Sequence, residues 1–299
     1  LAYQDVKNKT VRHAWRTNQG WFSEVVETKA GIGDFVAVSG GPGGIVHMAY
    51  YDASTGDLRY ANNDGGKWTP VVVDATNDVG QFVSIGVYAS GAVHLAYLDY
   101  TNQDLRYATD ESSPGTFAAK TIEGAVNAAG FYASLGLDNN GKVHISHYEL
   151  VGSDLLYTTN LGGPWKTEIV DQAGTVGQYT SIATSASGNV HIAYVNVDTS
   201  MARFAVGKQG TWVTSQLETI QKATATVVAT WGTEVYVAYN SQNNGSYYER
   251  VRLGTRKGSS FTYEYADRGV TSEWCQGGMV GWTGPRTAFA TRLARVVLP

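Results

Sequence analysis

Histidine occupies the same position in four copies of a short motif, and imidazole is a common ligand of transition metals. The copies place His47, His94, His144 and His191 at intervals of 47, 50 and 47 residues. Regular repeats hold equivalent positions apart instead of gathering them. We therefore expect each histidine to form the same hydrogen bond between neighbouring repeats, and we expect no metal site and no cofactor.

The copy of this motif that runs from His144 to Glu149 differs from the others in a way that suggests acid–base chemistry. His147 stands where the other copies have tyrosine, and Glu149 stands where most have aspartate. A histidine near a carboxylate can serve as a general base. His147, Tyr148 and Glu149 are accordingly the candidate catalytic residues, with neutral sequence drift as the alternative interpretation.

A second group of polar and aromatic residues could bind a sugar. Carboxylates and amides form hydrogen bonds with hydroxyl groups, and aromatic rings pack against the apolar C–H face of a pyranose. Such residues end the histidine motif and open the segment after it, on what we expect to be one face of the molecule. The candidate ligand-binding residues are Asp34, Asp52, Gln81, Phe82, Asp99, Tyr132, Gln178 and Tyr179. The alternative is that they only cap strands and complete turns.

The motif belongs to a longer repeat with a period of about 47 residues. Tyr50, Tyr97, His147, Tyr194 and Tyr239 are equivalent positions, and a truncated copy begins at Leu1. Each period continues with a segment such as Asp57–Ala61, a Gly-Trp turn and an apolar run that ends in an acid. Four short β-branched or aromatic runs separated by turn residues predict four antiparallel strands in each period.

Four-stranded repeats of this length predict an all-β protein, a β-propeller in which each sheet is one blade. Since one such sheet cannot bury both of its faces, the blades must pack side by side, and we expect residues 1–299 to form a single domain. Seven segments resemble second strands, including Thr287–Thr291, which favours seven blades. Division of 299 residues by a period of about 47 leaves six blades as the alternative. The first blade lacks its innermost strand because Leu1 lies inside a repeat.

Composition excludes several classes of protein and partner. With 43% hydrophobic residues the chain can bury a core, which excludes intrinsic disorder. The net charge of −4 argues against a nucleic-acid or anionic-membrane partner. No apolar run has the length of a membrane-spanning helix, so membrane insertion is not expected. Cys275 is the only cysteine, which excludes an intrachain disulfide.

The segment from Asn62 to Trp68 resembles the Asp-box, the S-x-D-x-G-x-x-W hairpin of sialidase-type propellers, although it is one residue shorter. Over essentially the whole chain, the repeat resembles bacterial secreted BNR-like propellers and seven-bladed propeller lectins. Those groups include fucose-binding lectins, sialidases and propeller-type polysaccharide lyases, and the lyases use histidine and tyrosine for proton abstraction and donation. The resemblance implies a glycan or polysaccharide partner and a secreted or cell-surface location.

The distribution of polar groups over the repeats distinguishes three possible functions. Equivalent polar groups in every repeat favour a carbohydrate-binding or adhesive protein without catalytic activity, in which weak sites act together. A single asymmetric cluster favours a polysaccharide lyase or glycosidase acting on an acidic glycan through His147, Tyr148 and Glu149. A scaffold with a protein partner would show a broad apolar patch. Because the repeat dominates the sequence, carbohydrate binding is the leading expectation.

Overall fold

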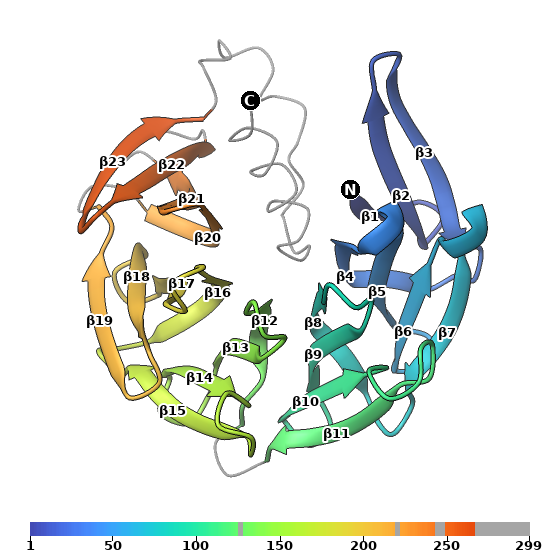
Figure 1. The fold of residues 1–299 in the computed structure, drawn as a ribbon, viewed down its shortest axis with the longest axis horizontal. Helices are drawn as coiled ribbons and strands as arrows, with labels where there is room; N and C mark the ends of the chain where they lie inside the picture. The colour runs from blue at the N-terminus through green and yellow to red at the C-terminus, as the bar shows by residue number, and fades with distance from the viewer. Residues whose placement is uncertain (125–127, 219–221, 243–248, 267–299) are drawn as a thin grey trace.

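The computed structural model describes residues 1–124, 128–218, 222–242 and 249–266 (Figure 1). These residues form β-strands, turns and two short 3₁₀ helices, η1 (Pro42–Gly44) and η2 (Asp64–Gly66). Cys275 and the expected motif copy at Thr287–Thr291 lie outside the described residues.

The repeats fold as six antiparallel sheets, which we call blades 1 to 6 in chain order. Blade 1 consists of β1 (Ala2–Asp5), β2 (Thr10–Thr17) and β3 (Gly20–Glu27), and blade 2 of β4 (Ile32–Gly40), β5 (Val46–Asp52), β6 (Asp57–Asn62) and β7 (Thr69–Asp74). Blade 3 consists of β8 (Val79–Val87), β9 (Val93–Asp99), β10 (Asp104–Thr109) and β11 (Ala118–Glu123), and blade 4 of β12 (Phe131–Leu137), β13 (Val143–Tyr148), β14 (Leu155–Thr159) and β15 (Lys166–Asp171). Blade 5 consists of β16 (Val176–Thr184), β17 (Val190–Asn196), β18 (Met201–Lys208) and β19 (Thr211–Gln216), and blade 6 of β20 (Lys222–Trp231), β21 (Glu234–Gln242), β22 (Glu249–Lys257) and β23 (Ser260–Tyr265).

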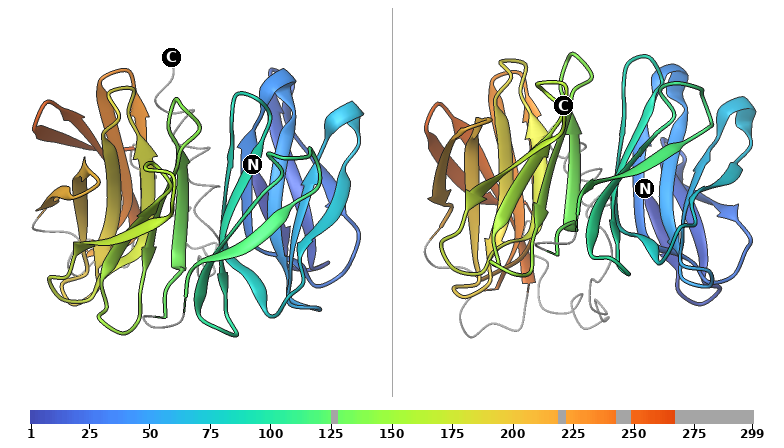
Figure 2. Two further views of the ribbon diagram at one scale, coloured as in Figure 1. Left: turned by 60° about the horizontal axis from the view of Figure 1, so that its bottom comes forward. Right: turned by 90° about the horizontal axis from the view of Figure 1, so that it is seen from below.

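The blades stand side by side around a central axis, with the first strand of each four-stranded blade innermost and the last outermost (Figure 1). Viewed from the side, the strands run between two faces that carry the turns (Figure 2). This arrangement is the predicted β-propeller. The six blades of the described residues agree with the six-bladed alternative, and the three strands of blade 1 confirm that β1 is equivalent to a second strand.

Hydrophobic cores lie between neighbouring blades, because each sheet covers one face of the next. The cluster shared by blades 2 and 3 includes Leu58, Val83 and Tyr97, and comparable clusters join every other adjacent pair from blade 1 to blade 6. All seven residues of β9 are buried, whereas β11 at the rim is largely exposed. The second strand of a blade is therefore buried on both faces, whereas the outermost strand meets solvent.

A tyrosine, an arginine and an acid from two adjacent blades recur as one hydrogen-bonded unit, which we call the Tyr–Arg–acid unit. At the contact of blades 2 and 3, the Tyr97 hydroxyl donates to Asp74 Oδ2 at 2.6 Å, and Arg106 pairs with the same carboxylate at 2.9 Å. Burial and the neighbouring Asp74 raise the pKa of Tyr97, so its hydroxyl remains a donor. The same unit is formed by Tyr50, Arg59 and Glu27, by Tyr194, Arg203 and Asp171, and by Tyr239, Arg252 and Glu218. Arg59, Arg106, Arg203 and Arg252 thus each pair with an acid of the preceding blade.

Three of the four recurring histidines make a hydrogen bond within a blade, so the expected bond between blades is wrong. The fourth, His191, stacks on Phe204 in place of the tyrosine, and its Nδ1 has no hydrogen-bond partner. His94 Nδ1 lies 2.6 Å from the hydroxyl of Tyr107 on the next strand of the same sheet, and His47 and His144 repeat this contact with Tyr60 and Tyr157. The hydrogen-bond partner belongs to the same blade because the pairing of the second and third strands brings the tyrosine of the third strand next to the histidine of the second. Among the described residues, no group of three or more His, Cys, Asp or Glu side chains could hold a metal ion.

Candidate functional site

His147 lies at the contact of blades 3 and 4 and is completely buried. The backbone N–H of Gly130 donates to its Nδ1 at 3.4 Å, which leaves the proton on Nε2, 2.9 Å from Thr158 Oγ1. Glu123 Oε2 lies 3.5 Å from the same Nε2 and accepts a hydrogen bond from Thr167. Burial lowers the pKa of His147 to about 3 and raises the pKa of Glu123. The imidazole is therefore neutral, and no solvent reaches it.

The structure places the other two candidate catalytic residues in the same buried region without forming a joint site. Tyr148 is 3% exposed, and its ring contacts that of Tyr132 at a centroid distance of 6.3 Å. Glu149 accepts hydrogen bonds from the backbone N–H groups of Val151 and Gly152 at 3.0 and 2.7 Å. The Glu149 carboxylate thus holds the turn that follows β13.

Asp52 and Asp99 hold the equivalent turns of blades 2 and 3 and are completely buried. Asp99 accepts hydrogen bonds from the backbone N–H and the side-chain amide of Asn102 at 3.0 and 2.9 Å. Asp52 accepts from Ser54 and pairs with Lys29. Burial alone raises the pKa of Asp52, but the hydrogen bonds from Lys29 and Ser54 outweigh it and lower the pKa. For these two residues the geometry matches the turn-capping interpretation.

Four aromatic side chains form a continuous row across the innermost strands of blades 2 to 5, which we call the aromatic row. Its members are Phe35, Phe82, Tyr132 and Tyr179. Successive ring centroids lie 4.8, 4.8 and 4.7 Å apart, and each ring is half-buried. Since the members belong to consecutive blades, the row passes from blade to blade around the axis (Figure 1).

All four members of the aromatic row have a positive φ, between 49° and 54°. This conformation is strained for an aromatic residue and persists only where the surroundings impose it. Each lies at a β-bulge, where the register of the first strand on the second shifts. The glycine two residues before each of Phe35, Phe82, Tyr132 and Tyr179 also has a positive φ, near 100°. The bulge turns these aromatic side chains out of the regular alternation.

Asp34, Gln81 and Gln178 precede three members of the aromatic row and are half-buried beside it. Gln81 Nε2 donates to Asp78 Oδ1 at 3.4 Å. Six of the predicted ligand-binding residues are therefore brought together on the inner strands, whereas Asp52 and Asp99 are engaged in turns.

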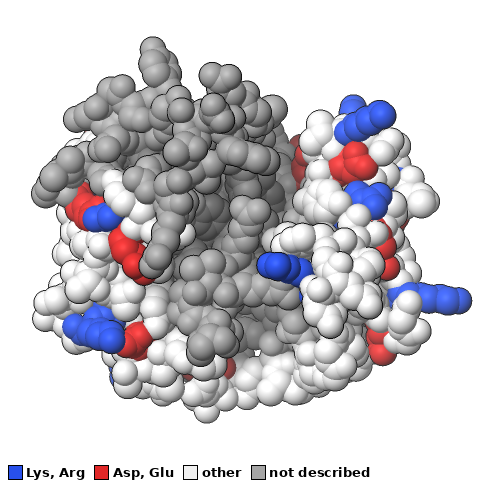
Figure 3. Space-filling view, turned by 90° about the horizontal axis from the view of Figure 1, so that it is seen from above, with Lys and Arg blue, Asp and Glu red and all other residues white. Residues whose placement is uncertain are grey.

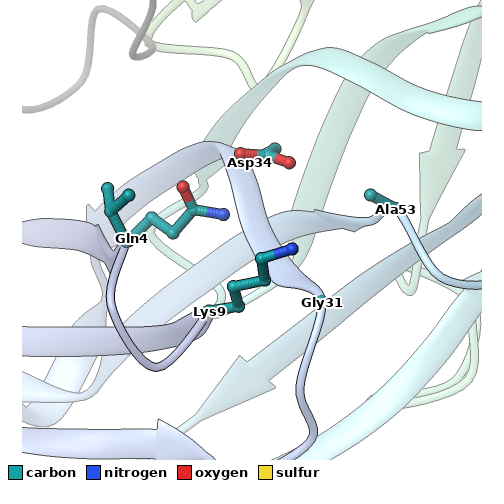
Figure 4. A pocket seen from close by; sticks show the side chains of 6 residues that line it. Gln4, Lys9, Gly31, Asp34 and Ala53 are labelled. Atoms are coloured by element: carbon teal, nitrogen blue, oxygen red, sulfur yellow. The ribbon is translucent and has the colours of Figure 1, made fainter.

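A pocket of about 270 Å³ opens between blades 1 and 2, beside the start of the aromatic row. Its lining residues are Gln4, Val6, Lys9, Gly31, Asp34 and Ala53. The side chains of Gln4, Lys9 and Asp34 surround one space (Figure 4). Within the part of the chain that the structure describes, no ion pair is found for either the Lys9 ammonium or the Asp34 carboxylate. The pocket thus presents an amide, a cation and a carboxylate to a ligand.

Blade 1 differs from blade 2 at one position that bears on the pocket. Gln4 follows the recurring tyrosine position, where the next blades carry Tyr51, Leu98, Tyr148 and Val195. At the contact of blades 2 and 3, Tyr51 extends across the corresponding space and donates its hydroxyl to Asp78 Oδ1 at 2.8 Å. The shorter Gln4 leaves this space open between blades 1 and 2.

Of these pocket residues, Asp34 was predicted from the sequence, whereas Gln4 and Lys9 were not. The signal for Gln4 was present, since it is polar at a position that is apolar or aromatic in blades 2 to 5, although blade 6 also has a polar residue there, Asn240. Lys9 could not be found from the repeat, because it lies in a turn and reaches the pocket only through the fold.

Comparisons with solved structures place this fold among β-propellers. The chain is similar to AofleA from Arthrobotrys oligospora, with 14% identity, 88% of this chain and 84% of that chain covered, and a TM-score of 0.58. It is also similar to the Aleuria aurantia lectin in complex with Fucα1-6GlcNAc, with 11% identity, 91% and 93% covered, and a TM-score of 0.56. An α-L-arabinanase from Penicillium chrysogenum complexed with arabinobiose gives 10% identity, 74% and 88% covered, and a TM-score of 0.52.

At these identities the similarity shows the fold alone. No protein-family model matches the chain, and no curated protein matches its sequence. No helix of the described residues is long and apolar enough to cross a membrane.

Proposed function

We propose that this protein is a non-catalytic carbohydrate-binding propeller, and that the pocket between blades 1 and 2 holds one sugar unit of a glycan. The observation that carries the proposal is the convergence of Gln4, Lys9 and Asp34 on one space beside a row of aromatic rings. Solved structures of similar fold include a lectin bound to a fucosyl disaccharide and an arabinanase bound to arabinobiose, which supports a glycan ligand.

The chemistry of the pocket suits neighbouring hydroxyl groups of a sugar. The Asp34 carboxylate accepts from a hydroxyl, and the Lys9 ammonium donates to the adjacent oxygen. The Gln4 amide, whose Nε2 donates to the Ile32 carbonyl at 3.4 Å, can accept through its oxygen. Charged partners make such hydrogen bonds stronger than neutral ones. With opposite charges on the two sides, the pocket favours an uncharged ligand over an anion or a cation.

The size of the pocket limits the ligand. Drug-sized ligands occupy pockets of about 300–1,000 Å³. A pocket of about 270 Å³ suits a single pyranose or furanose unit, so we expect recognition of a terminal or side-chain sugar. A glycan ligand also agrees with the expected secreted or cell-surface location.

A glycan array followed by calorimetric titration tests the proposal. We expect the wild-type protein to bind a restricted set of neutral sugars, and Asp34→Asn or Lys9→Met to weaken binding about tenfold or more, since each removes a charge-assisted hydrogen bond. Asp64→Asn is the matched control, because Asp64 is an exposed carboxylate in η2, between β6 and β7, away from the pocket. Absence of binding across the array, or full affinity in Asp34→Asn, would overturn the proposal.

A further inference from the structure

Two exposed aromatic side chains lie next to each other on the outer hairpin of blade 1. Trp15 of β2 and Phe22 of β3 form a cross-strand pair and are 37% and 41% exposed. Their ring centroids are 5.8 Å apart with an angle of 22° between the planes. The His13 ring continues the row at 5.4 Å from Trp15, with an angle of 16°. Three nearly parallel rings thus end at the protein surface.

This pair is a property of blade 1 and not of the repeat. The equivalent cross-strand pairs of the other blades contain no aromatic residue: Asn62 with Thr69, Thr109 with Ala118, Thr159 with Lys166, Val206 with Val213, and Thr255 with Thr262. The fold therefore does not require aromatic rings here, although each exposed ring raises the risk of aggregation. A local function explains their presence better than packing does.

Contacts with neighbouring side chains fix the inner end of this row of rings. His13 takes the place of the third-strand tyrosine, packs edge-on against Trp68 at 5.4 Å, and lies 3.3 Å from Glu24 Oε1. Trp68 Nε1 donates to the same carboxylate oxygen at 2.8 Å. The base of the row is thus held by contacts with blade 2, which limits the conformational entropy lost on binding.

From this geometry we propose that Trp15 and Phe22 form a second carbohydrate-binding surface, on which a β-linked hexopyranose chain of the glucan or N-acetylglucosamine type stacks. Such sugars expose an apolar face of axial C–H groups, which packs on aromatic rings while the equatorial hydroxyls stay in water. A protein partner fits less well, because a stable interface buries about 800 Å² on each side. Two half-exposed rings supply only a small part of that area. In the view from above, both signs of charge are scattered over the described surface without gathering into a patch of one sign (Figure 3).

The stacking surface is separate from the pocket between blades 1 and 2. Lys9 precedes β2 and Trp15 lies six residues further along it, a distance of about 20 Å at the rise of a β-strand. A long polysaccharide can therefore use the surface whether or not the pocket is occupied, and the two sites can fail independently.

Affinity electrophoresis in native gels that contain hydroxyethyl-cellulose or glycol chitin tests the surface. We expect at least one polymer to retard the wild-type protein, and Trp15→Ala and Phe22→Ala each to weaken retention about tenfold. Trp15→Phe should retain most of the binding. Trp21→Ala is the matched control, because Trp21 is 55% exposed on the same hairpin but projects from the opposite face of the sheet.

The outcomes separate this surface from the proposed pocket. Asp34→Asn should leave retention by the polymers unchanged while it weakens binding on the glycan array. The stacking surface is refuted if neither polymer retards the wild-type protein, or if Trp21→Ala lowers retention as much as Trp15→Ala does. Thermal unfolding of each variant shows whether it is folded. If Trp15→Ala does not fold, Phe22→Ala still tests the stacking surface.

Discussion

At the scale of single residues, blade 4 shows how two linked substitutions alter one interblade contact. His147 takes the place of the tyrosine of the Tyr–Arg–acid unit, and Leu156 takes the place of its arginine. Glu123 keeps the acid position, but two threonine hydroxyls replace the guanidinium as its donors. A neutral imidazole fits this site because it donates a hydrogen bond without bringing a second charge into the contact.

The burial of His147 predicts a defined pH dependence of stability. Its pKa of about 3 in the folded protein lies below the usual 6.5, so the unfolded chain takes up the proton first. The contribution of His147 to stability is therefore present above about pH 6.5 and is lost as the pH falls toward 3, by at most ~1.4 kcal/mol per pH unit. Urea unfolding at several pH values should show a shallower loss in His147→Gln. Because other buried histidines titrate too, the difference between wild type and variant is the quantity to compare.

The same variant tests the catalytic assignment, which stays a prediction. If His147, Tyr148 and Glu149 carry out lyase chemistry, the wild-type protein creates unsaturated ends in a uronate polymer and His147→Gln abolishes the reaction. Complete burial of His147 leads us to expect no effect of this substitution on glycan turnover or binding. If the free energy of unfolding changed equally with pH in the wild-type protein and in His147→Gln, His147 would not be buried in its neutral form.

The sequence reveals which single residues depart from the repeat, but it does not reveal which side chains surround them in the fold. His147 was visible as a departure from the repeat, and the companion change at Leu156 was visible too. Reading the two together indicates an altered structural contact, since a catalytic base needs no change in a neighbouring interblade arginine. Gln4 was missed because its effect is an absence of side-chain volume, which depends on what the other blade places opposite it.

At the scale of elements, a glycine at the start of the first strand allows blades 3, 4 and 5 each to approach the previous blade closely. A Cβ atom on Gly80, whose φ is +108°, would lie 2.9 Å from Leu58 Cα of blade 2. Gly177 and Gly130 repeat this approach to Leu155 and Leu105. Because the glycine also starts the bulge, it positions the following residues of the aromatic row.

Substitution of this glycine should destabilise the protein beyond the cost of its φ angle. We expect Gly80→Ala to lower the free energy of unfolding by about 1–3 kcal/mol more than Gly91→Ala, owing to steric overlap with the backbone at Leu58. Gly91 is the matched control, because its φ is +94° but an added Cβ meets nothing within 4 Å. Urea unfolding of the two variants measures the difference. If Gly80→Ala and Gly91→Ala lowered the free energy of unfolding equally, the short distance between Gly80 and Leu58 would add nothing to the cost of the positive φ.

The strands themselves were largely predictable, whereas the bulges were not. The motif Val46–Asp52 coincides with β5, and its copies coincide with β9 and β17, because β-branched and aromatic runs between turn residues define strands directly. Alternation along a strand gives no sign of an extra residue, so the positive φ of Phe82 and Tyr179 was not foreseen. That is why the sequence selected the aromatic residues as candidates without predicting that they form a row.

At the scale of the whole molecule, the low content of charged residues follows from the architecture. With 16% charged residues, the chain has few charges to place, and several are used in Tyr–Arg–acid units between blades. The pocket and the stacking surface both involve blade 1, where Gln4, His13 and the Trp15–Phe22 pair depart from the repeat. The expectation of equivalent sites in every blade is thus replaced by a proposal of two unequal sites. A protein partner stays a prediction.

The shared cores predict that the propeller unfolds as one unit, which also tests the expectation that residues 1–299 form one domain. Each blade buries a face only through its neighbours, and each adjacent pair of the described blades shares a hydrophobic cluster. Repeat proteins of this kind gain stability mainly at the interfaces between units, so loss of one interface exposes the next.

Hydrogen exchange pulse-labelling at increasing urea concentrations can measure each blade separately. We expect peptides from β9 and from β17 to lose protection at the same urea concentration in the wild-type protein. Gly80→Ala alters only the contact of blades 2 and 3, yet it should shift both midpoints by the same amount. Were β17 to keep its protection where β9 has lost it, the interfaces would be too weak to couple the blades, and the chain would be a row of partly independent units.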